Sequence, residues 1–128
     1  MISKIKQFDV VYVDFGKNMV GSEQGGKRPA IIIQNDVGNH YSNTTIVIPL
    51  STKIKNMYQP THMLIKKESD KGLDCDSIAL GECVRQISKE RIEKVMGKIS
   101  KIHEKQLLIK IYLANIGNNF LGEKMNHY

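Results

Sequence analysis

The chain has 128 residues, of which 41% are hydrophobic and 25% are charged, values typical of a globular protein with one domain. Lysine and arginine outnumber aspartate and glutamate by 19 to 13, and the resulting net charge of +6 favours a polyanionic partner. No run of about 18 apolar residues predicts a transmembrane helix, and no apolar segment of a secretory signal is seen at the N-terminus. The two cysteines, Cys75 and Cys83, lack metal-site spacing and predict reduced thiols in a cytoplasmic protein, although their spacing also permits a disulfide.

Short β-branched runs bounded by Gly, Pro, Asn or Asp predict strands in the first three quarters of the chain. These runs cover residues 9–15, 30–33, 45–50, 61–65, 77–80 and 93–99. Residues 35–39 (NDVGN) have the composition of a turn. Residues 16–26 contain four glycines and predict a mobile loop, the kind of segment that often carries function.

The C-terminal part changes to a helical period. From Ser100 onward apolar residues recur every three or four positions, which predicts an amphipathic helix with Ser100 as N-cap and Gly117 as its stop. A shorter helical turn is expected at 88–92. Strands followed by helices indicate an α+β fold, a small and strongly bent antiparallel sheet with helices at one side. We expect one domain at residues 1–117 and a polar tail at residues 118–128.

Familiar catalytic motifs are absent from the sequence. Asp70, Asp74 and Asp76 lie close together, but their spacing does not match a calcium loop and is typical of a solvated turn. No nucleophile elbow, P-loop or dinucleotide fingerprint occurs. Among the four histidines, His62 is the best placed for acid–base chemistry because it follows Pro60-Thr61 at a strand start. A surface or structural role is the alternative for His62.

The segment 25–29 (GGKRP) joins the glycine loop to a hydrophobic strand. Pro29 favours an extended backbone at Arg28, and a planar guanidinium held at such a junction suits phosphate recognition. An ordinary surface arginine beside a flexible loop remains the alternative. The glycine loop itself could also bind phosphate through its backbone N–H groups.

The segment 21–36 (GSEQGGKRPAIIIQND) resembles the hallmark segment of the MazF/PemK-type toxin endoribonucleases. Further pieces resemble the same family at compatible spacing over residues 7–117: DVVY at 9–12, TIVIPLST at 45–52, PTH at 60–62, DS at 76–77 and LGECVRQI at 80–87. The resemblance implies an SH3-like barrel of the MazF/PemK/CcdB type that forms a homodimer. It also implies that the protein cuts single-stranded RNA at short sequence motifs without a metal ion or other cofactor, and that the acidic C-terminal tail of a MazE-like antitoxin blocks it.

The family resemblance also implies a mechanism in which the ribose 2′-OH attacks the adjacent phosphorus and leaves a 2′,3′-cyclic phosphate and a 5′-OH. Arg28 matches the catalytic arginine of the family and would stabilise the charge that develops on the phosphorane. Ser51 falls where the family usually has a threonine and keeps its hydroxyl, with Thr52 as the alternative.

The remaining site residues are expected to contact RNA: Ser22, Glu23, Gln24, Lys27, Thr52, His62, Asp76, Ser77, Glu82 and Cys83. Glu23 is also a candidate base. Cys83 stands where the family often has glutamine, so the base preference of the family does not carry over directly. A base-stacking ring could come from Tyr41, Tyr58 or Phe15.

Two other functions are compatible with the composition. One is a non-enzymatic, CcdB-like toxin that binds a protein target such as gyrase. The other is a basic nucleic-acid-binding module without catalysis. The GGKRP segment favours the endoribonuclease, because a toxin that acts on a protein target has no need of that arginine.

Overall fold

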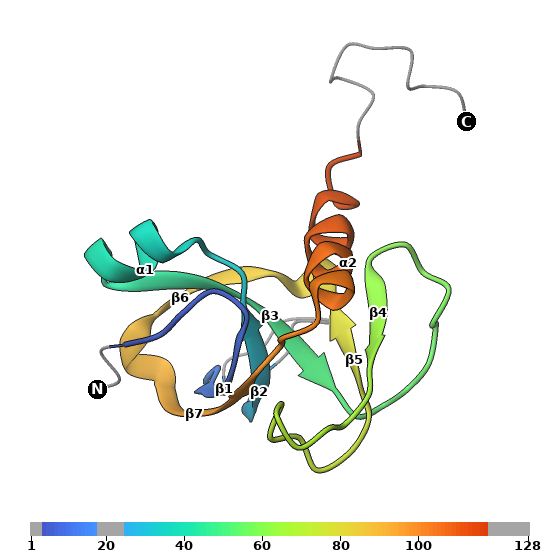
Figure 1. Cartoon of the computed structure of the whole chain (residues 1–128), viewed down its shortest axis with the longest axis horizontal. Helices are drawn as coiled ribbons and strands as arrows, with labels where there is room; N and C mark the ends of the chain where they lie inside the picture. The colour runs from blue at the N-terminus through green and yellow to red at the C-terminus, as the bar shows by residue number, and fades with distance from the viewer. Residues whose placement is uncertain (1–3, 18–24, 118–128) are drawn as a thin grey trace.

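The computed structural model describes residues 4–17 and 25–117. These residues form a bent antiparallel sheet, two α-helices and two 3₁₀ turns (Figure 1). The strands are β1 (Asp9–Asp14), β2 (Lys27–Ile32), β3 (Thr44–Ser51), β4 (His62–Ile65), β5 (Ser77–Leu80), β6 (Arg85–Ser88) and β7 (Ile92–Lys98). The helices are α1 (Asp36–Tyr41) and α2 (Ile102–Leu113), and the 3₁₀ turns are η1 (Gly81–Cys83) and η2 (Lys89–Arg91).

The eight-residue strand β3 is the centre of the sheet. Strand order is β4-β5-β3-β2-β1-β7, and β6 also pairs with β3. The first half of β3 pairs with β6, and its last two residues, Leu50 and Ser51, pair with β5. Among the described residues β7 pairs only with β1, so the sheet is open. The predicted α+β class and strongly bent antiparallel sheet are confirmed.

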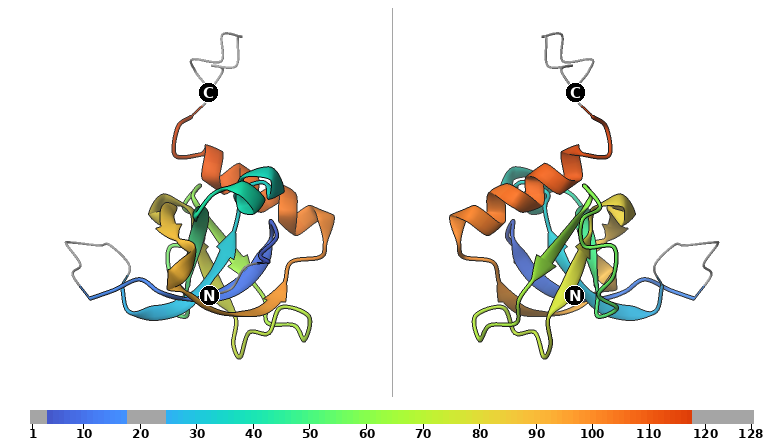
Figure 2. Two further views of the ribbon diagram at one scale, coloured as in Figure 1. Left: turned by 90° about the vertical axis from the view of Figure 1, so that its left-hand side faces the viewer. Right: turned by 90° about the vertical axis from the view of Figure 1, so that its right-hand side faces the viewer.

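The central strands bury side chains on both faces of the sheet. The adjacent residues Val10 and Val11 are both fully buried, but they belong to different apolar clusters. Val10 packs in the cluster that contains Leu108 and Ile111 of α2, whereas Val11 packs in the cluster that contains Phe15. Helix α2 lies across one side of the sheet in both views of Figure 2. Burial on both sides explains why these strands read as continuous apolar runs rather than alternating ones.

Two segments differ from the sequence-based expectation. Residues 35–39 were expected to form a turn, but they begin helix α1, with Asn35 as an N-cap whose side chain accepts a hydrogen bond from the Gly38 amide at 2.9 Å. The expectation was wrong because asparagine and aspartate favour both turns and helix N-caps. Residues 85–88 form β6, which the pattern did not predict because only Ile87 in this short segment is buried.

Helix α2 begins one residue later than expected, with Lys101 rather than Ser100 at the N-cap position. The Ser100 hydroxyl donates to Asp70 Oδ2 at 2.5 Å instead of capping the helix, and the regular helix starts at Ile102. At the other end Gly117 adopts a left-handed backbone (φ 75°), and its amide donates to the Leu113 carbonyl at 3.2 Å. The predicted helix is confirmed. No helix in the described part of the chain has the length and apolarity to cross a membrane.

The loop between β4 and β5 is fixed against α2 by a buried lysine. Lys71 is 1% exposed, and its ammonium contacts Glu68 at 2.8 Å, Glu104 at 2.9 Å and the Lys66 carbonyl at 3.0 Å. A buried ammonium with three oxygen partners avoids the desolvation penalty of an unpaired charge. This network holds the β4–β5 loop to helix α2.

Candidate functional site

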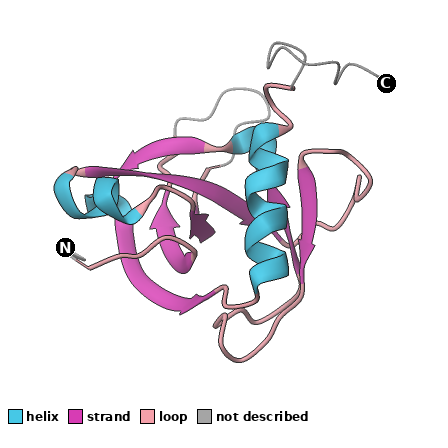
Figure 3. Cartoon of the chain, turned by 45° about the horizontal axis from the view of Figure 1, so that its top comes forward, coloured by secondary structure: helices cyan, strands magenta, loops and turns pink. Residues whose placement is uncertain are grey.

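A cleft of about 420 Å³ opens at the end of β3. Five of its residues were predicted site residues: Arg28, Ser51, His62, Glu82 and Cys83. They come from β2, the end of β3, the start of β4 and the turn η1. The connection from β3 to β4, residues 52–61, forms one wall and runs as the long loop beyond β4 in Figure 3. The topology therefore brings together residues that lie more than 50 positions apart in the chain.

Arg28 is half-buried and fixed by the main chain. Its Nε–H donates to the Gly25 carbonyl at 3.1 Å, and its Nη1 donates to the Leu50 carbonyl at 3.4 Å. Pro29 follows it and pairs with Tyr12 of β1, so the backbone beside the guanidinium belongs to a rigid sheet. The remaining N–H groups are free of hydrogen-bond partners among the described residues. Such a fixed guanidinium fork is suited to binding phosphate oxygens.

Ser51 is the last residue of β3 and is partly exposed. Its Oγ accepts a hydrogen bond from the Lys53 amide at 3.2 Å, which leaves the hydroxyl hydrogen available to a bound molecule. The same strand end carries the Leu50 carbonyl that holds Arg28. Arg28 and Ser51 are thus positioned by one piece of backbone.

His62 and Glu82 form an ion pair in the wall of the cleft. His62 Nε2 lies 2.8 Å from Glu82 Oε2, and His62 Nδ1 lies 2.9 Å from the Asn56 carbonyl oxygen. The other carboxylate oxygen of Glu82 accepts a hydrogen bond from the Thr61 hydroxyl at 3.1 Å. The Thr61 hydroxyl in turn accepts a hydrogen bond from the side-chain Nε2 of Gln59 at 2.9 Å. These contacts join loop 52–61 to the turn η1.

Two groups of the cleft have shifted pKa values. Burial of Glu82 opposes its ionisation, but hydrogen bonds from His62, from the backbone and from Thr61 outweigh burial and lower the pKa of the carboxyl below its usual value. Burial raises the pKa of the Cys83 thiol, the Glu82 charge adds to that rise, and Arg28 opposes it. Cys83 is therefore a protonated thiol at neutral pH, a weak donor beside an ionised carboxylate.

Other predicted site residues do not line this cleft. The Lys27 ammonium forms an ion pair with Glu93 of β7 at 2.9 Å, and Thr52 is exposed outside the cleft lining. Asp76 accepts a hydrogen bond from the Lys67 amide at 2.8 Å, and the buried Ser77 donates to the Cys75 carbonyl at 3.2 Å. The predicted contacts Ser22, Glu23 and Gln24 lie outside the described residues.

Several cleft residues were missed by the sequence pattern. Apart from Leu80 at the end of β5, they lie in the β3–β4 connection: Lys53, Lys55, Asn56 and Gln59. Two lysines at alternate positions directly after a strand that ends in a candidate hydroxyl were the available signal. The signal was hidden because lysines occur throughout this basic chain.

The three aromatic candidates for base stacking differ in how much of each ring is exposed. Phe15 is 2% exposed, with Arg85 5.3 Å above its ring, so it has no free face for a base. Tyr41 is exposed at the end of α1 and packs edge-on against His40. Tyr58 is fully exposed and lies in the loop that forms the cleft wall. Tyr58 is therefore the aromatic residue nearest in sequence to the cleft lining.

Within residues 4–17 and 25–117, no group of three or more His, Cys, Asp or Glu side chains is arranged to hold a metal ion. Cys75 and Cys83 are both free thiols.

The Glu82–His62 pair leads to a prediction about acid stability. The lowered pKa of Glu82 means that the folded state binds its proton less readily than the unfolded state does. The contact thus stabilises the fold above the unfolded-state pKa, and this stability is lost as pH falls through the lower folded-state pKa. Urea unfolding of the wild type and Glu82→Gln, from about pH 6 to about pH 3, should give a small difference that shrinks toward acid.

The matched control is Glu90→Gln, because Glu90 is exposed and pairs with no cation in the described residues. Its difference from the wild type should be smaller than that of Glu82→Gln near pH 6. A Glu82→Gln difference that stays constant down to the acid limit would contradict the ion pair.

Sequence and structure comparisons agree with this fold. The family described as PemK-like, MazF-like toxin of type II toxin–antitoxin system matches residues 6–114. Endoribonuclease EndoA of Bacillus subtilis is 42% identical over 88 residues, which cover 69% of this chain and 74% of that protein.

Solved structures share the fold at low sequence identity. A MazF from Deinococcus radiodurans gives a TM-score of 0.72 at 15% identity and covers 88% of this chain and 96% of its own. A mycobacterial endoribonuclease in complex with its cognate antitoxin gives 0.70 at 16% identity and covers 89% and 96%. The predicted family and enzyme class are confirmed, and the CcdB-like alternative is not favoured. The chain belongs to the PemK-like, MazF-like toxin family of type II toxin–antitoxin systems.

Proposed function

We propose that the cleft at the end of β3 is where this toxin-family endoribonuclease cuts single-stranded RNA, such as mRNA, at a short sequence motif. The observation that carries the proposal is the placement of Arg28 and Ser51 in one cleft, with the guanidinium fixed by two main-chain carbonyls. An anion held by a fixed arginine and a hydroxyl fits the scissile phosphate. The family membership supports the same reading.

The proposed reaction needs no metal ion. The ribose 2′-OH gives up its proton as its oxygen attacks the adjacent phosphorus, the bond from phosphorus to the 5′-oxygen breaks, and the leaving 5′-oxygen takes up a proton. A 2′,3′-cyclic phosphate and a 5′-OH result. Arg28 binds the non-bridging oxygens and stabilises the added negative charge of the phosphorane. The Ser51 hydroxyl donates to a phosphate oxygen or orients the 2′-OH. Arg28 acts through its charge rather than as a proton donor, because a guanidinium stays protonated.

The first test is cleavage of a long RNA in EDTA by the purified protein, with the cut ends mapped. We expect cleavage to continue without divalent metal and to leave cyclic phosphate ends. Arg28→Ala should lower kcat/KM by about 100-fold or more, as expected when a positioned electrostatic group is lost. Arg28→Lys should recover only part of the activity, because lysine keeps the charge but lacks the planar fork.

A matched control for Arg28→Ala is Arg91→Ala. Arg91 lies in η2, and its Nη1 donates to the Asp14 carbonyl at 3.1 Å, away from the cleft. This control variant should cut RNA at close to the wild-type rate. Full activity of Arg28→Ala, or activity that EDTA abolishes, would disprove the proposed site or its metal-free chemistry.

The second test compares the two neighbouring hydroxyls. Ser51→Ala should cost far more kcat than Thr52→Ala, because Ser51 lines the cleft and Thr52 does not. Single-turnover cleavage by the two variants measures this directly. The reverse order would show that Thr52 is the functional hydroxyl.

The proposed partners follow from family and charge. We propose that the toxin acts on RNA in the cytoplasm and that the acidic C-terminal tail of a MazE-like antitoxin competes for the cleft. Arg28, Lys53 and Lys55 line the cleft with a single carboxylate, Glu82, among the described residues. Such a surface attracts RNA phosphates and acidic peptide alike.

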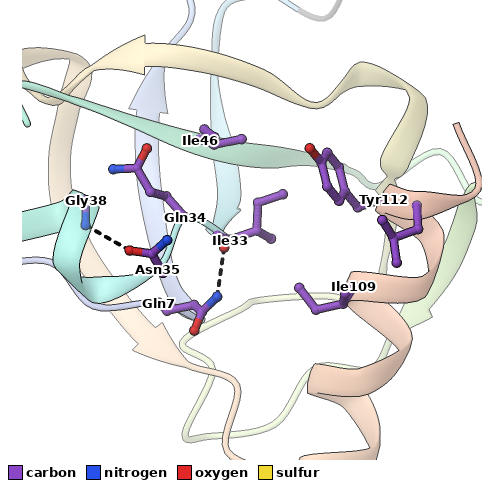
Figure 4. Close-up of a pocket in the computed structure, with 9 residues that line it drawn as sticks. Gln7, Ile33, Gln34, Asn35, Gly38, Ile46, Ile109 and Tyr112 are labelled. Carbon is purple, nitrogen blue, oxygen red and sulfur yellow. Dashed lines mark hydrogen bonds between the residues drawn. The ribbon is translucent and has the colours of Figure 1, made fainter. Parts of the chain in front are cut away.

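We also propose that residues 1–117 act as one domain, with 118–128 as a tail, and that two copies pair as a homodimer. An apolar groove of about 360 Å³ between α1 and α2 supports this pairing. Ile33 and Ile46 line its floor, and Ile109 and Tyr112 of α2 form one wall (Figure 4). Leu113 at its edge is 52% exposed. An apolar patch at a groove is typical of a surface covered by a second chain.

The dimer proposal is tested by sedimentation velocity. The wild type should sediment as a dimer, and Leu113→Glu should shift it toward monomer because a charge at this edge opposes burial. Lys110→Glu, a change to the same residue type at an exposed position of the same helix, is the control. A monomeric wild type, or a Leu113→Glu variant as dimeric as the control, would contradict the proposal.

A further inference from the structure

The cleft carries two lysines that the proposed reaction does not use. Lys53 and Lys55 line it beside Arg28, and both residues are exposed. Within the described residues neither ammonium forms an ion pair, whereas Lys27, Lys71 and Lys101 each bind a glutamate. Two lysines without carboxylate partners at the mouth of an anion-binding cleft are free to bind further phosphates. Lys53 and Lys55 together form the lysine rim.

The carboxylate nearest to the rim does not neutralise it. Glu82 is the only acidic residue that lines the cleft among the described residues. One of its oxygens faces His62 at 2.8 Å, and the other accepts from Thr61 at 3.1 Å. Both carboxylate oxygens of Glu82 are therefore engaged inside the wall of the cleft, whereas Arg28 and the lysine rim present their cationic groups without a carboxylate partner in the described residues.

The segment that carries the rim has no regular secondary structure, so its position depends on a few contacts. At its start the Lys53 amide donates to Ser51 Oγ at 3.2 Å. Asn56 has a left-handed backbone (φ 56°) where the segment reverses. Its carbonyl accepts from the Gln59 amide at 3.1 Å and lies 2.9 Å from His62 Nδ1. The side chain of His62 therefore connects the chain reversal at Asn56 to Glu82 of η1.

The hydrogen-bond partners of His62 define its role. A carbonyl oxygen only accepts, so Nδ1 must carry a hydrogen toward Asn56. At the other end of the ring, Nε2 lies 2.8 Å from Glu82 Oε2. The His62 side chain is 6% exposed, whereas the Glu82 side chain is 38% exposed. In this arrangement the ring joins the rim segment to η1 through both of its nitrogens.

We propose that Lys53 and Lys55 bind RNA phosphates that flank the one being cut, and that His62 is the positioning residue that holds them there by tying Asn56 to Glu82. This inference rests on the proposed function, because it takes Arg28 as the binding site of the scissile phosphate. Flanking phosphates keep the same charge in the substrate and in the transition state. The rim therefore contributes to binding rather than to the chemical step.

The test uses an RNA oligonucleotide with one cut site and measures kcat and KM from about 50 to about 300 mM KCl. Lys53→Met/Lys55→Met should raise KM about 10-fold at the lowest salt and leave kcat within about twofold. The slope of log KM against log salt should fall by about 1.4, because each phosphate contact on a single strand contributes about 0.7. Lys66→Met/Lys110→Met removes the same charge from exposed positions outside the cleft and should change the slope little.

His62→Ala gives the second arm of the test. On its own it should raise KM and lower the salt slope without lowering kcat beyond about twofold. Added to Lys53→Met/Lys55→Met it should raise KM by less than about twofold more, since a residue that acts through the lysines has no further effect once they are gone. If His62→Ala does not fold, His62→Gln replaces it, because one amide nitrogen reaches one of the two acceptors but not both.

Binding is also measured by fluorescence anisotropy with an RNA that carries a 2′-deoxyribose at the cut site and cannot be cleaved. A lysine-rim variant with the Kd and salt slope of the Lys66→Met/Lys110→Met control would disprove the phosphate role. A His62→Ala effect that adds fully to the lysine variant, or that falls on kcat, would disprove the positioning role. Neither result would affect the proposed cut site, which fails instead if Arg28→Ala keeps full activity.

Discussion

Burial of both faces of the central strands is the constraint on which the rest of the molecule depends. Because β1, β2 and β3 are covered on one side by α2 and on the other by the curled sheet itself, polar side chains fit mainly where a strand ends. Strand β3 ends at Ser51, and the guanidinium of Arg28 binds the carbonyl just before it. The chemistry thus lies at the edge of the apolar core, on backbone that the core holds rigid.

Six of the seven described strands, the C-terminal helix and the meeting of Arg28 and Ser51 in one cleft could be predicted from the sequence, because they depend on local pattern and on a family segment. The helix at 36–41 could not be distinguished from a turn, since Asn35 suits both and tertiary contacts decide between them. The contact between His62 and Glu82 also required the fold, since β4 and β5 must pair before residues 20 positions apart meet. The ion pair between Lys27 and Glu93 likewise depends on the packing of β2 and β7 near β1, which the local sequence does not reveal.

The pairing of individual charges, rather than the net charge of the chain, determines which lysines are available to bind a polyanion. Lys71 and Lys101 share Glu68, whose pKa is lowered to about 2 by hydrogen bonds from both ammonium groups. These lysines hold the β4–β5 loop to the start of α2 and are not available to a polyanion. At the cleft the relation is reversed, because the carboxylate is paired within the wall and the lysines at the mouth are not. Local pairing, rather than the total of +6, gives the molecule its electrostatic polarity.

Cys83 gives the cleft a thiol that can be labelled selectively. The chain has two cysteines, and the exposed Cys75 is not among the cleft residues. Replacing Cys75 by serine would leave a single thiol, Cys83, inside the cleft that Arg28 also lines. The raised pKa of that thiol means that alkylating reagents would react slowly at neutral pH and faster in alkali. A fluorophore attached to Cys83 would report directly on a molecule that enters or leaves the cleft.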